Sequence, residues 1–549
     1  MPAASPHHPP STRAAVLLAV LAALAAALGT AVLVRADAGL SVRQITVDGV
    51  PMTEVRAGPP TPDVRRPGVV IAHGFAGSAR LMRPLADTVA RRGAVALLFD
   101  FAGHGANPAR LGPDMSPATL AADLDAAVGY LRSRPDVDPA QIMLVGHSMG
   151  AGAVTRYAAG HPEIARTVAI SLPDAGELPP GRPAELLLIV GGAEFPAFRR
   201  AADDAVGRGA AVGRRPAVVV PGVEHISVLF APRTHEEIAD WLPSVDGTAS
   251  PRPLVRLAGA ALLVLAFAIG VVPVAALLLG RRGTGSPAPA GSAAPAGSAA
   301  PAGSAAPAGS AAPAGSPAPA GSPAPAAERV PLGAPALLGL AVVATGAGAA
   351  AAAVLPTNRL PLAVGGYVIG FLLVIGLLMI AGQRWLPAAT RAPGVTPAPG
   401  ATLGETGRRT PARTTVAAMA LTAYAVLAVS LPIHLGLTSA LPVGARWWLL
   451  PVVVGACLLF LLGVEQVAAG LTWRRLLVVA VTVLVLSTSA VIGLAPGFVL
   501  LVVPLFAVLL GWHVLWAAVL RRYATPRWLP ALVGAALLGW PIATTLPLR

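Results

Sequence analysis

The five residues Gly146-His147-Ser148-Met149-Gly150 constrain the fold more than any other stretch of the chain. The apolar run Ile142 to Val145 comes directly before them, and the helix-compatible run Ala151 to Ala159 comes directly after. This order predicts a strand, a sharp turn and a helix, with Ser148 at the apex of the turn. Glycine on both sides allows a strained backbone, so we expect the serine hydroxyl to be exposed beside the helix N-terminus.

The segment 39–247 alternates short apolar runs with amphipathic or Ala-rich stretches. The runs have the length of strands and are apolar on both faces, as parallel strands covered by helices need to be. They are Val69–Ala72, Ala94–Phe99, Ile142–Val145, Thr167–Ile170, Leu186–Val190 and Ala217–Val220. Between them, Ser116 and Pro117 are typical of a helix N-cap and first helical position. We therefore predict an α/β fold with a doubly wound, mostly parallel sheet and helices on both faces.

A serine hydroxyl is a weak nucleophile near neutral pH unless a base accepts its proton and a third group orients that base. Both partners follow in the sequence, each just after a predicted strand: first Glu194, then His225. The carboxyl ends of parallel strands meet at one edge of a sheet. We therefore expect Ser148, Glu194 and His225 to lie together, although 77 residues separate the first from the last.

Two backbone amides are candidates to stabilise negative charge beside Ser148. One is the N–H of Met149, directly after the serine, and the other is the N–H of Phe75, just after another predicted strand. Fixed donors of this kind stabilise a developing oxyanion. The neighbouring His73 is expected to organise its loop. A triad supplies its own activation, so no metal or organic cofactor is expected, and the single Cys457 excludes a disulfide framework and a cysteine metal site.

Four motifs occur in the order typical of one family. They are His73-Gly74-Phe75-Ala76-Gly77-Ser78, Asp100-Phe101-Ala102-Gly103-His104-Gly105, Gly146-His147-Ser148-Met149-Gly150 and Gly222-Val223-Glu224-His225. On these motifs the segment from about 40 to 247 resembles the α/β-hydrolase superfamily, particularly serine hydrolases of the lipase, esterase and serine-aminopeptidase-like type. The resemblance implies Ser148 as nucleophile, His225 as general base and then acid, Glu194 as the group that orients it, and Phe75 and Met149 as the oxyanion hole.

Other polar residues near these motifs have simpler interpretations. The superfamily more often has Asp at the acid position, so Asp174 and Asp203 stay open as alternatives to Glu194. We expect Asp100 and His104 to stabilise the turn after a strand, and His147 to be packed. His161 and His235 are expected on helix surfaces.

Long apolar segments flank the α/β segment on both sides. The first, Ala14 to Val34, has 21 residues between Arg13 and Arg35, enough to cross a bilayer. Ala36-Asp37-Ala38 resembles a signal-peptidase site, but the apolar core is longer than the roughly 7–15 residues typical of a signal peptide. We therefore favour an N-terminal anchor at 1–38 over a cleaved signal peptide. A second predicted transmembrane helix spans 254–280.

Residues 281–330 form a low-complexity linker rich in Ala, Pro, Gly and Ser, with Gly-Ser recurring every six residues from 291 to 321. Small residues and periodic proline cannot build a core, so we expect a flexible spacer. The remaining segment, 331–549, is predicted to hold about seven more membrane-spanning helices, which makes about nine in all. These are near 335–355, 360–382, 415–437, 446–468, 475–494, 498–520 and 528–546.

The charge distribution predicts membrane orientation rather than nucleic-acid binding. The net charge is +14, but residues 40–247 carry −2 and the rest of the chain carries +16. With the N-terminus inside, the short flanks on the inner side hold 14 Arg and those on the outer side hold 6. An excess of Arg marks the cytoplasmic side. We therefore predict a multi-pass protein of the cell membrane with the α/β segment on the extracytoplasmic side.

Three ionisable residues lie within the predicted spans: His434, Glu465 and His513. Such groups are costly in lipid and are often functional. A proton or substrate path through them is one interpretation. Solvation at helix ends or hydrogen bonding between helices is the interpretation we prefer.

Together these features predict a membrane-tethered serine hydrolase that cleaves an ester, or less readily an amide, through an acyl-enzyme. Tethering on both sides favours small-molecule esters that are lipid-like or belong to the cell envelope. The stretch from Leu172 to Glu185 is too short for the lid that larger relatives insert there, so we expect an open site. The alternative is a non-catalytic binding domain of a membrane transporter or an envelope-assembly protein.

Overall fold

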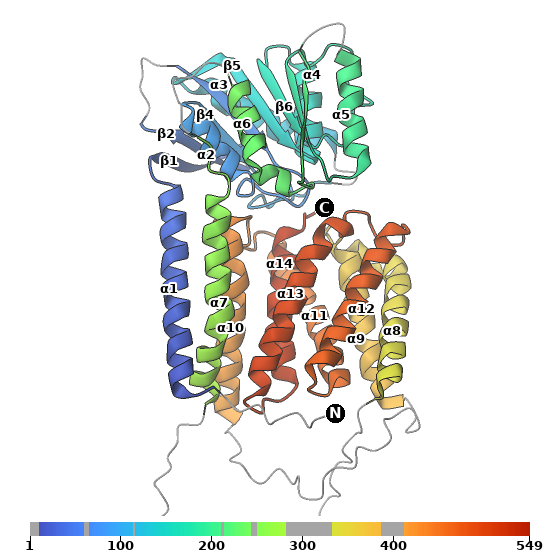
Figure 1. The fold of residues 1–549 in the computed structure, drawn as a ribbon. Helices are drawn as coiled ribbons and strands as arrows, with labels where there is room; N and C mark the ends of the chain where they lie inside the picture. The colour runs from blue at the N-terminus through green and yellow to red at the C-terminus, as the bar shows by residue number, and fades with distance from the viewer. Residues whose placement is uncertain are drawn as a thin grey trace, which may run out of the picture.

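The computed structural model describes residues 10–59, 65–112, 116–209, 214–242, 250–280, 332–385 and 411–549. It has two parts: an α/β domain, from β1 to α6, which lies over one end of a bundle of long helices, α1 and α7 to α14 (Figure 1). The expected linker at 281–330 lies outside the described residues.

The α/β domain is built on an eight-stranded sheet in the order β1-β2-β4-β3-β5-β6-β7-β8. Six strands, which follow one another in this order from β4 to β8, are mutually parallel. Each overlaps one of the predicted runs. They are β3 (Arg66–Ala72), β4 (Val95–Phe99), β5 (Val137–His147), β6 (Arg166–Ile170), β7 (Leu186–Gly191) and β8 (Ala217–Val220). The prediction of a mostly parallel sheet is therefore confirmed.

The structure has an antiparallel hairpin at one edge of the sheet that the sequence analysis does not predict. It consists of β1 (Leu40–Val47) and β2 (Val50–Ala57), and β2 pairs antiparallel with β4. Most residues of β1 are exposed, because an edge strand has little to cover it, so its sequence shows no continuous apolar run. Asp48 and Gly49 connect the two strands with φ of 50° and 81°, values that a tight hairpin turn requires.

Helices cover both faces of the sheet, as predicted. On one face, α2 (Arg83–Arg91) and α6 (Pro232–Trp241) share a core with the strands, as do residues of the short 3₁₀ helix η2 (Ser227–Phe230). On the other face lie α3 (Pro117–Ser133), α4 (Met149–Gly160) and α5 (Pro196–Gly209). Ser116 caps α3 as expected, since its hydroxyl accepts a hydrogen bond from Thr119 N–H.

In the described residues, nine helices are long and apolar enough to cross a membrane. They are α1 (Thr12–Ala36), α7 (Val255–Leu279), α8 (Ala334–Val354), α9 (Gly365–Trp385), α10 (Pro411–Gly436), α11 (Arg446–Ala468), α12 (Thr472–Val491), α13 (Val499–Arg521) and α14 (Trp528–Thr545). Their ends fall within a few residues of the predicted spans. Helix α1 packs along α7, and α7 packs on α10, which joins this pair to the other helices (Figure 1).

A buried group of charged side chains links three of these helices. The carboxylate of Glu465 on α11 accepts two hydrogen bonds from the guanidinium of Arg475 on α12, at 2.6 and 2.8 Å. On α13, His513 Nε2 lies 3.6 Å from the same carboxylate. The interhelical pairing expected for Glu465 is therefore present, near the end of the bundle that lies away from the α/β domain.

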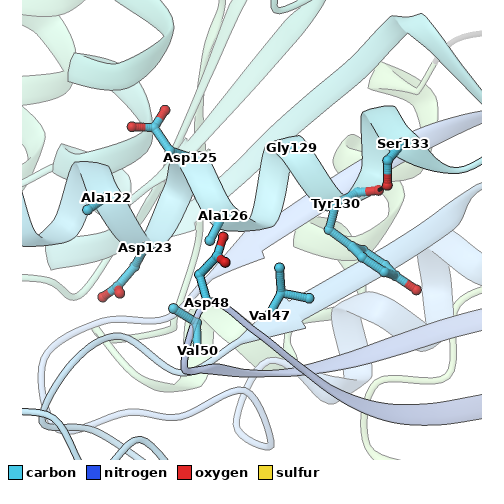
Figure 2. Close-up of a pocket in the computed structure, with 10 residues that line it drawn as sticks. All are labelled: Val47, Asp48, Val50, Ala122, Asp123, Asp125, Ala126, Gly129, Tyr130 and Ser133. Atoms are coloured by element: carbon cyan, nitrogen blue, oxygen red, sulfur yellow. Dashed lines mark hydrogen bonds between the residues drawn. The ribbon is translucent and has the colours of Figure 1, made fainter.

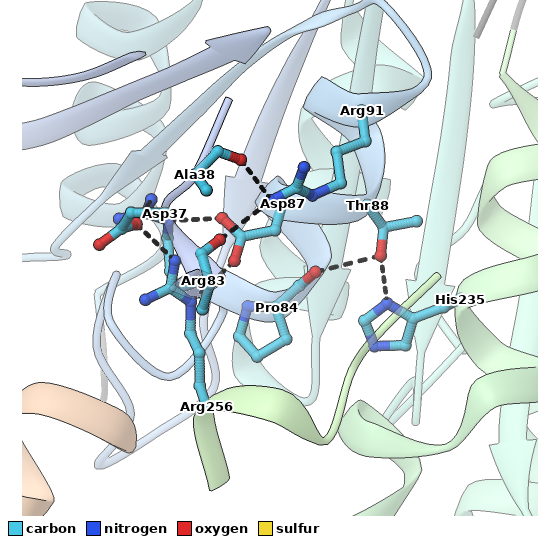
Figure 3. Close-up of polar contacts among 10 residues, drawn as sticks. Asp37, Ala38, Arg83, Pro84, Asp87, Thr88, Arg91, His235 and Arg256 are labelled. Carbon is cyan, nitrogen blue, oxygen red and sulfur yellow. Dashed lines mark hydrogen bonds and ion pairs between the residues drawn. The ribbon is translucent and has the colours of Figure 1, made fainter. Parts of the chain in front are cut away.

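Four charged residues form a closed ring that fixes the α/β domain to α1 and α7 (Figure 3). Arg83 on α2 pairs with Asp37, just after α1, and with Asp87, at 2.6 and 2.7 Å. Arg256 at the start of α7 pairs with the same two carboxylates at 2.6 and 2.7 Å. Arg91 also donates hydrogen bonds to the carbonyl groups of residues 36 and 38. The ring limits rotation of the domain about these two helices.

Candidate active site

The turn at Ser148 has the strained geometry expected of its sequence. Ser148 has φ 52° and ψ −117°, and its N–H donates to the carbonyl of Ile170 on the neighbouring strand β6 at 2.9 Å. A Cβ on Gly146 would collide with the Gly150 carbonyl, and a Cβ on Gly150 would collide with the His73 carbonyl. Both positions therefore require glycine. The turn leaves Ser148 partly exposed between β5 and α4.

The structure brings Ser148, His225 and Glu194 together. Ser148 Oγ lies 3.0 Å from His225 Nε2, and His225 Nδ1 lies 3.1 Å from Glu194 Oε2. The three residues follow β5, β8 and β7, at the carboxyl edge of the parallel sheet. The alternative acids do not reach this group: Asp174 accepts a hydrogen bond from Gly176 N–H in an exposed loop, and Asp203 is exposed on α5.

The hydrogen bonds of Glu194 determine how His225 is protonated. Glu194 Oε1 accepts from Ser171 Oγ at 2.6 Å and from Gly191 N–H at 2.8 Å, which leaves Oε2 for His225. A carboxylate only accepts hydrogen bonds, so neutral His225 carries its proton on Nδ1. The lone pair of Nε2 then points to the hydroxyl of Ser148.

Ser171 was missed by the sequence analysis. It directly follows β6, has a positive φ of 55° and belongs to no recognised motif. Its place directly after a predicted strand is a signal in the sequence, but the strand order that brings it to Glu194 is known only from the fold.

Two rings hold the imidazole of His225 in place. The ring of His147 lies 4.8 Å from it, and the ring of Phe198 on α5 lies 4.5 Å from it, measured between centroids. Burial lowers the pKa of His147 to about 3, so this side chain is neutral and its Nε2–H donates to the His225 carbonyl at 2.9 Å. His147 is thus packed, as predicted, and it also fixes the backbone of His225.

The two candidate oxyanion donors come from different elements beside the serine. Met149 is the first residue of α4, and Phe75 follows Gly74, where an added Cβ would lie 3.1 Å from Ser148 Cβ. Within the described ranges, neither amide donates a hydrogen bond to another group. Both amides are therefore available to a bound molecule, and glycine at position 74 allows the close approach.

The other histidines of the domain have structural contacts. Phe101 N–H donates to His73 Nε2 at 3.1 Å, so Nδ1 carries the proton and donates to the Gly74 carbonyl at 2.8 Å. This arrangement agrees with the expected loop-organising role. Asp100 accepts from the N–H groups of Ala79 and Ala106, and His104 Nδ1 bonds the Ala102 carbonyl, so both stabilise the loop after β4 as predicted.

The surface position predicted for His235 is wrong. This side chain is fully buried between α6 and α2, where Nδ1 accepts from Thr88 Oγ1 at 2.7 Å (Figure 3). Its Nε2–H donates to the Leu229 carbonyl. Burial lowers its pKa to about 4. Its neighbours Ile238 and Trp241 are also buried, so it lies on the inner face of α6. His161 is partly exposed at the end of α4, as expected.

A hollow on the described surface lies apart from Ser148. A groove of about 550 Å³ runs between the β1–β2 turn and α3, lined by residues such as Val50, Asp123 and Tyr130 (Figure 2). Asp123, whose pKa burial raises to about 6, accepts a hydrogen bond from Ala102 N–H. None of the lining residues belongs to the Ser148 site, and in the described residues no group of three or more His, Cys, Asp or Glu side chains is arranged to hold a metal.

A strained serine turn between a central parallel strand and a helix, in a sheet covered on both faces, defines the α/β-hydrolase fold. Residues 64–198 match the sequence profile of the serine aminopeptidase family S33. This match and the sheet order assign the α/β domain to that fold.

Relatives by sequence cover the α/β domain in part. The chain is 33% identical to an uncharacterised protein of Mycobacterium tuberculosis over 183 residues, 29% of this chain and 63% of the relative. It is 33% identical to the thermostable monoacylglycerol lipase of a Bacillus species over 135 residues, 24% of this chain and 48% of the lipase. It is 29% identical to the quorum-quenching protein AidA of Acinetobacter baumannii over 110 residues, 20% of this chain and 36% of AidA. The chain thus spans less than two thirds of each relative.

Two similar solved structures cover nearly the same share of this chain. Dienelactone hydrolase from Anabaena variabilis has 22% identity and a TM-score of 0.32, with 37% of this chain and 97% of that chain covered. Est1E from Butyrivibrio proteoclasticus has 18% identity and a TM-score of 0.29, with 36% and 96% covered.

Proposed function

We propose that the α/β domain is a serine hydrolase that cleaves esters through an acyl-enzyme, with Ser148 as nucleophile, His225 as base and Glu194 as the group that orients the base. The observation that supports this proposal is the unbroken series of hydrogen bonds from Ser148 Oγ through His225 to Glu194. A serine in such a series can lose its proton to the imidazole as it attacks a carbonyl carbon.

The proposed reaction proceeds in two halves. Ser148 Oγ bonds to the ester carbonyl carbon while its proton passes to His225 Nε2, and the carboxylate of Glu194 stabilises the imidazolium. The N–H groups of Phe75 and Met149 donate to the oxyanion of the tetrahedral intermediate. The intermediate expels an alcohol, which takes the proton from Nε2. Water then attacks the acyl-enzyme by the same route and releases the acid.

The proposed substrate is a small lipid-like or cell-envelope ester. The relative from Bacillus is named a monoacylglycerol lipase, which agrees with an acyl ester, whereas the family name serine aminopeptidase leaves an amide as the less favoured bond. The protein is proposed to be a multi-pass membrane protein, supported by the nine long apolar helices found among the described residues. The Arg distribution supports an extracytoplasmic hydrolase domain. Protease treatment of intact cells should digest this domain, and protection from digestion would place it inside.

Labelling with a fluorophosphonate probe tests the catalytic proposal. The full-length protein should be labelled, and Ser148→Ala should not, because the probe needs an activated serine oxygen. Ser133→Ala is the matched control: Ser133 lies exposed on α3 with its hydroxyl bonded to the Tyr130 carbonyl, so its loss should leave labelling unchanged. A folded parent protein that resists the probe would favour the non-catalytic binding domain instead.

A further inference from the structure

The catalytic edge of the sheet faces the helical bundle. The loops that follow β3 and β4 carry two of the family motifs, and both loops contact the ends of bundle helices. After β3, Ser78 Oγ lies 2.8 Å from Thr438 Oγ1 and accepts from Ser439 N–H at 3.1 Å. Both of these residues lie in the connection between α10 and α11. Arg80 donates to the carbonyl of His434 at the end of α10.

The loop after β4 is held by the C-terminal residues of the chain. The carbonyl of Gly103 accepts from Leu548 N–H at 2.8 Å and from the buried guanidinium of Arg446, also at 2.8 Å. Leu111 N–H donates to the Leu548 carbonyl at 3.0 Å. A Cβ on Gly103 would collide with that carbonyl, so the glycine is needed for the contact. The second family motif therefore serves here as a docking surface.

One bundle residue reaches the oxyanion loop itself. The ring of Phe498, at the end of the α12–α13 connection, lies 4.6 Å from the ring of Phe75 in an edge-to-face contact. Phe75 is the proposed oxyanion donor, and the Gly74 before it packs against Ser148. The bundle thus forms part of the wall beside the serine. The loop from 171 to 185, where a lid would lie, contains turns and an isolated bridge but no helix.

Exposed apolar side chains lie along the connection between α12 and Phe498. Phe498 ends a short connection that begins at α12, and along it Leu494 is partly exposed and Ile492 is 69% exposed. Val491, the last residue of α12, is 71% exposed. Side chains of a membrane-spanning helix that face outward meet acyl chains. Three exposed apolar side chains, those of Val491, Ile492 and Leu494, therefore lie between the body of α12 and the residue that contacts the oxyanion loop.

We propose that residues 491–498 bind the acyl chain of a long-chain ester that stays dissolved in the adjacent leaflet while its carbonyl reaches Ser148. The proposal rests on the proposed hydrolase function and adds the substrate class and its determinant: Phe498, Leu494 and Ile492 form the acyl track. The position of the Ser148 site relative to this track is fixed by the charged ring at α1 and α7 and by the two docked loops. The substrate then arrives along the membrane surface rather than from water.

Two esters with the same leaving group separate chain binding from catalysis. Full-length protein in phosphatidylcholine nanodiscs is assayed with p-nitrophenyl acetate, which is water-soluble, and with p-nitrophenyl palmitate, which dissolves in the bilayer. Phe498→Ala should lower kcat/KM for the palmitate at least about tenfold, because even one lost methylene contact costs about that much, and it should lower kcat/KM for the palmitate more than for the acetate. Leu494→Asp should also lower kcat/KM for the palmitate more than for the acetate. It introduces a charge on the track and leaves the contact between the two phenylalanines in place.

Trp447→Ala serves as the control, since Trp447 is an exposed aromatic residue at the same end of the bundle and lies outside the track. It should leave both esters unchanged. Fluorophosphonate labelling of every variant reports on the catalytic machinery separately, so an unlabelled parent would end the hydrolase proposal itself. Labelled variants that lose both esters equally, or lose neither, would refute the acyl track.

Discussion

Replacing Glu194 by Gln should inactivate the enzyme without unfolding it. Gly191 N–H and Ser171 O–H both point at Glu194 Oε1. A glutamine would keep its carbonyl oxygen there, because an amide NH₂ cannot accept from Gly191 N–H. Its NH₂ would then face His225 Nδ1 and donate to it. This moves the imidazole proton to Nε2, which can no longer accept the proton of Ser148.

The expected loss is that of a base held in the wrong tautomer, about 10⁴-fold in kcat, or about 5.5 kcal/mol of activation free energy. The unfolding midpoint should stay close to that of the parent, because each hydrogen bond has a replacement. Turnover of p-nitrophenyl acetate measures the first quantity and thermal unfolding in detergent the second. Asp174→Asn and Asp203→Asn are the controls and should be fully active. If Glu194→Gln keeps its activity and one of these controls loses it, the assignment of the acid is wrong.

Two further predictions concern stability. Glu465→Ala should destabilise the bundle by about 3–5 kcal/mol, since it leaves the buried charge of Arg475 unpaired, and an unchanged thermal midpoint in detergent would contradict this. His235 has its pKa lowered to about 4 by burial, against about 6.5 when unfolded. The contribution of neutral His235 to the free energy of unfolding is therefore complete above pH 6.5. It falls by about 3 kcal/mol as the pH drops toward 4. His235→Gln should flatten the pH dependence of the unfolding midpoint in that window, and an equally steep profile would count against the assignment.

The elements that the sequence predicts well are those whose signal is local. The turn at Ser148 requires glycine at positions 146 and 150 for steric reasons that act within a few residues. Buried parallel strands need apolar residues on both faces, so their runs stand out. Strand β1 lacks this signal because its exposed face is polar, although Asp48-Gly49 is a typical hairpin dipeptide that could have been used.

Contacts between distant residues account for what was missed. Ser171 becomes a hydrogen-bond partner of Glu194 only because β6 lies between β5 and β7, an order that no local pattern specifies. The surface position predicted for His235 is wrong because the prediction leaves out its buried neighbours on the helix. Its spacing from Ile238 and Trp241, three and six positions along, indicated the buried face instead. The pairing of Thr88 with its ring could not be predicted without the fold.

The docking of the catalytic edge on the bundle has a consequence for how the site exchanges substrate. A hydrolase that carries its own lid must move that lid to admit an ester, and the motion sets a barrier. In this chain the cover beside the oxyanion loop belongs to the bundle, through Phe498, and the domain is fixed by the charged ring and by Ser78 and Gly103. The cover therefore stays in place. On the proposed function, chain-length preference should then depend on the bundle, whereas the rate for short esters should depend on the triad and the two oxyanion donors.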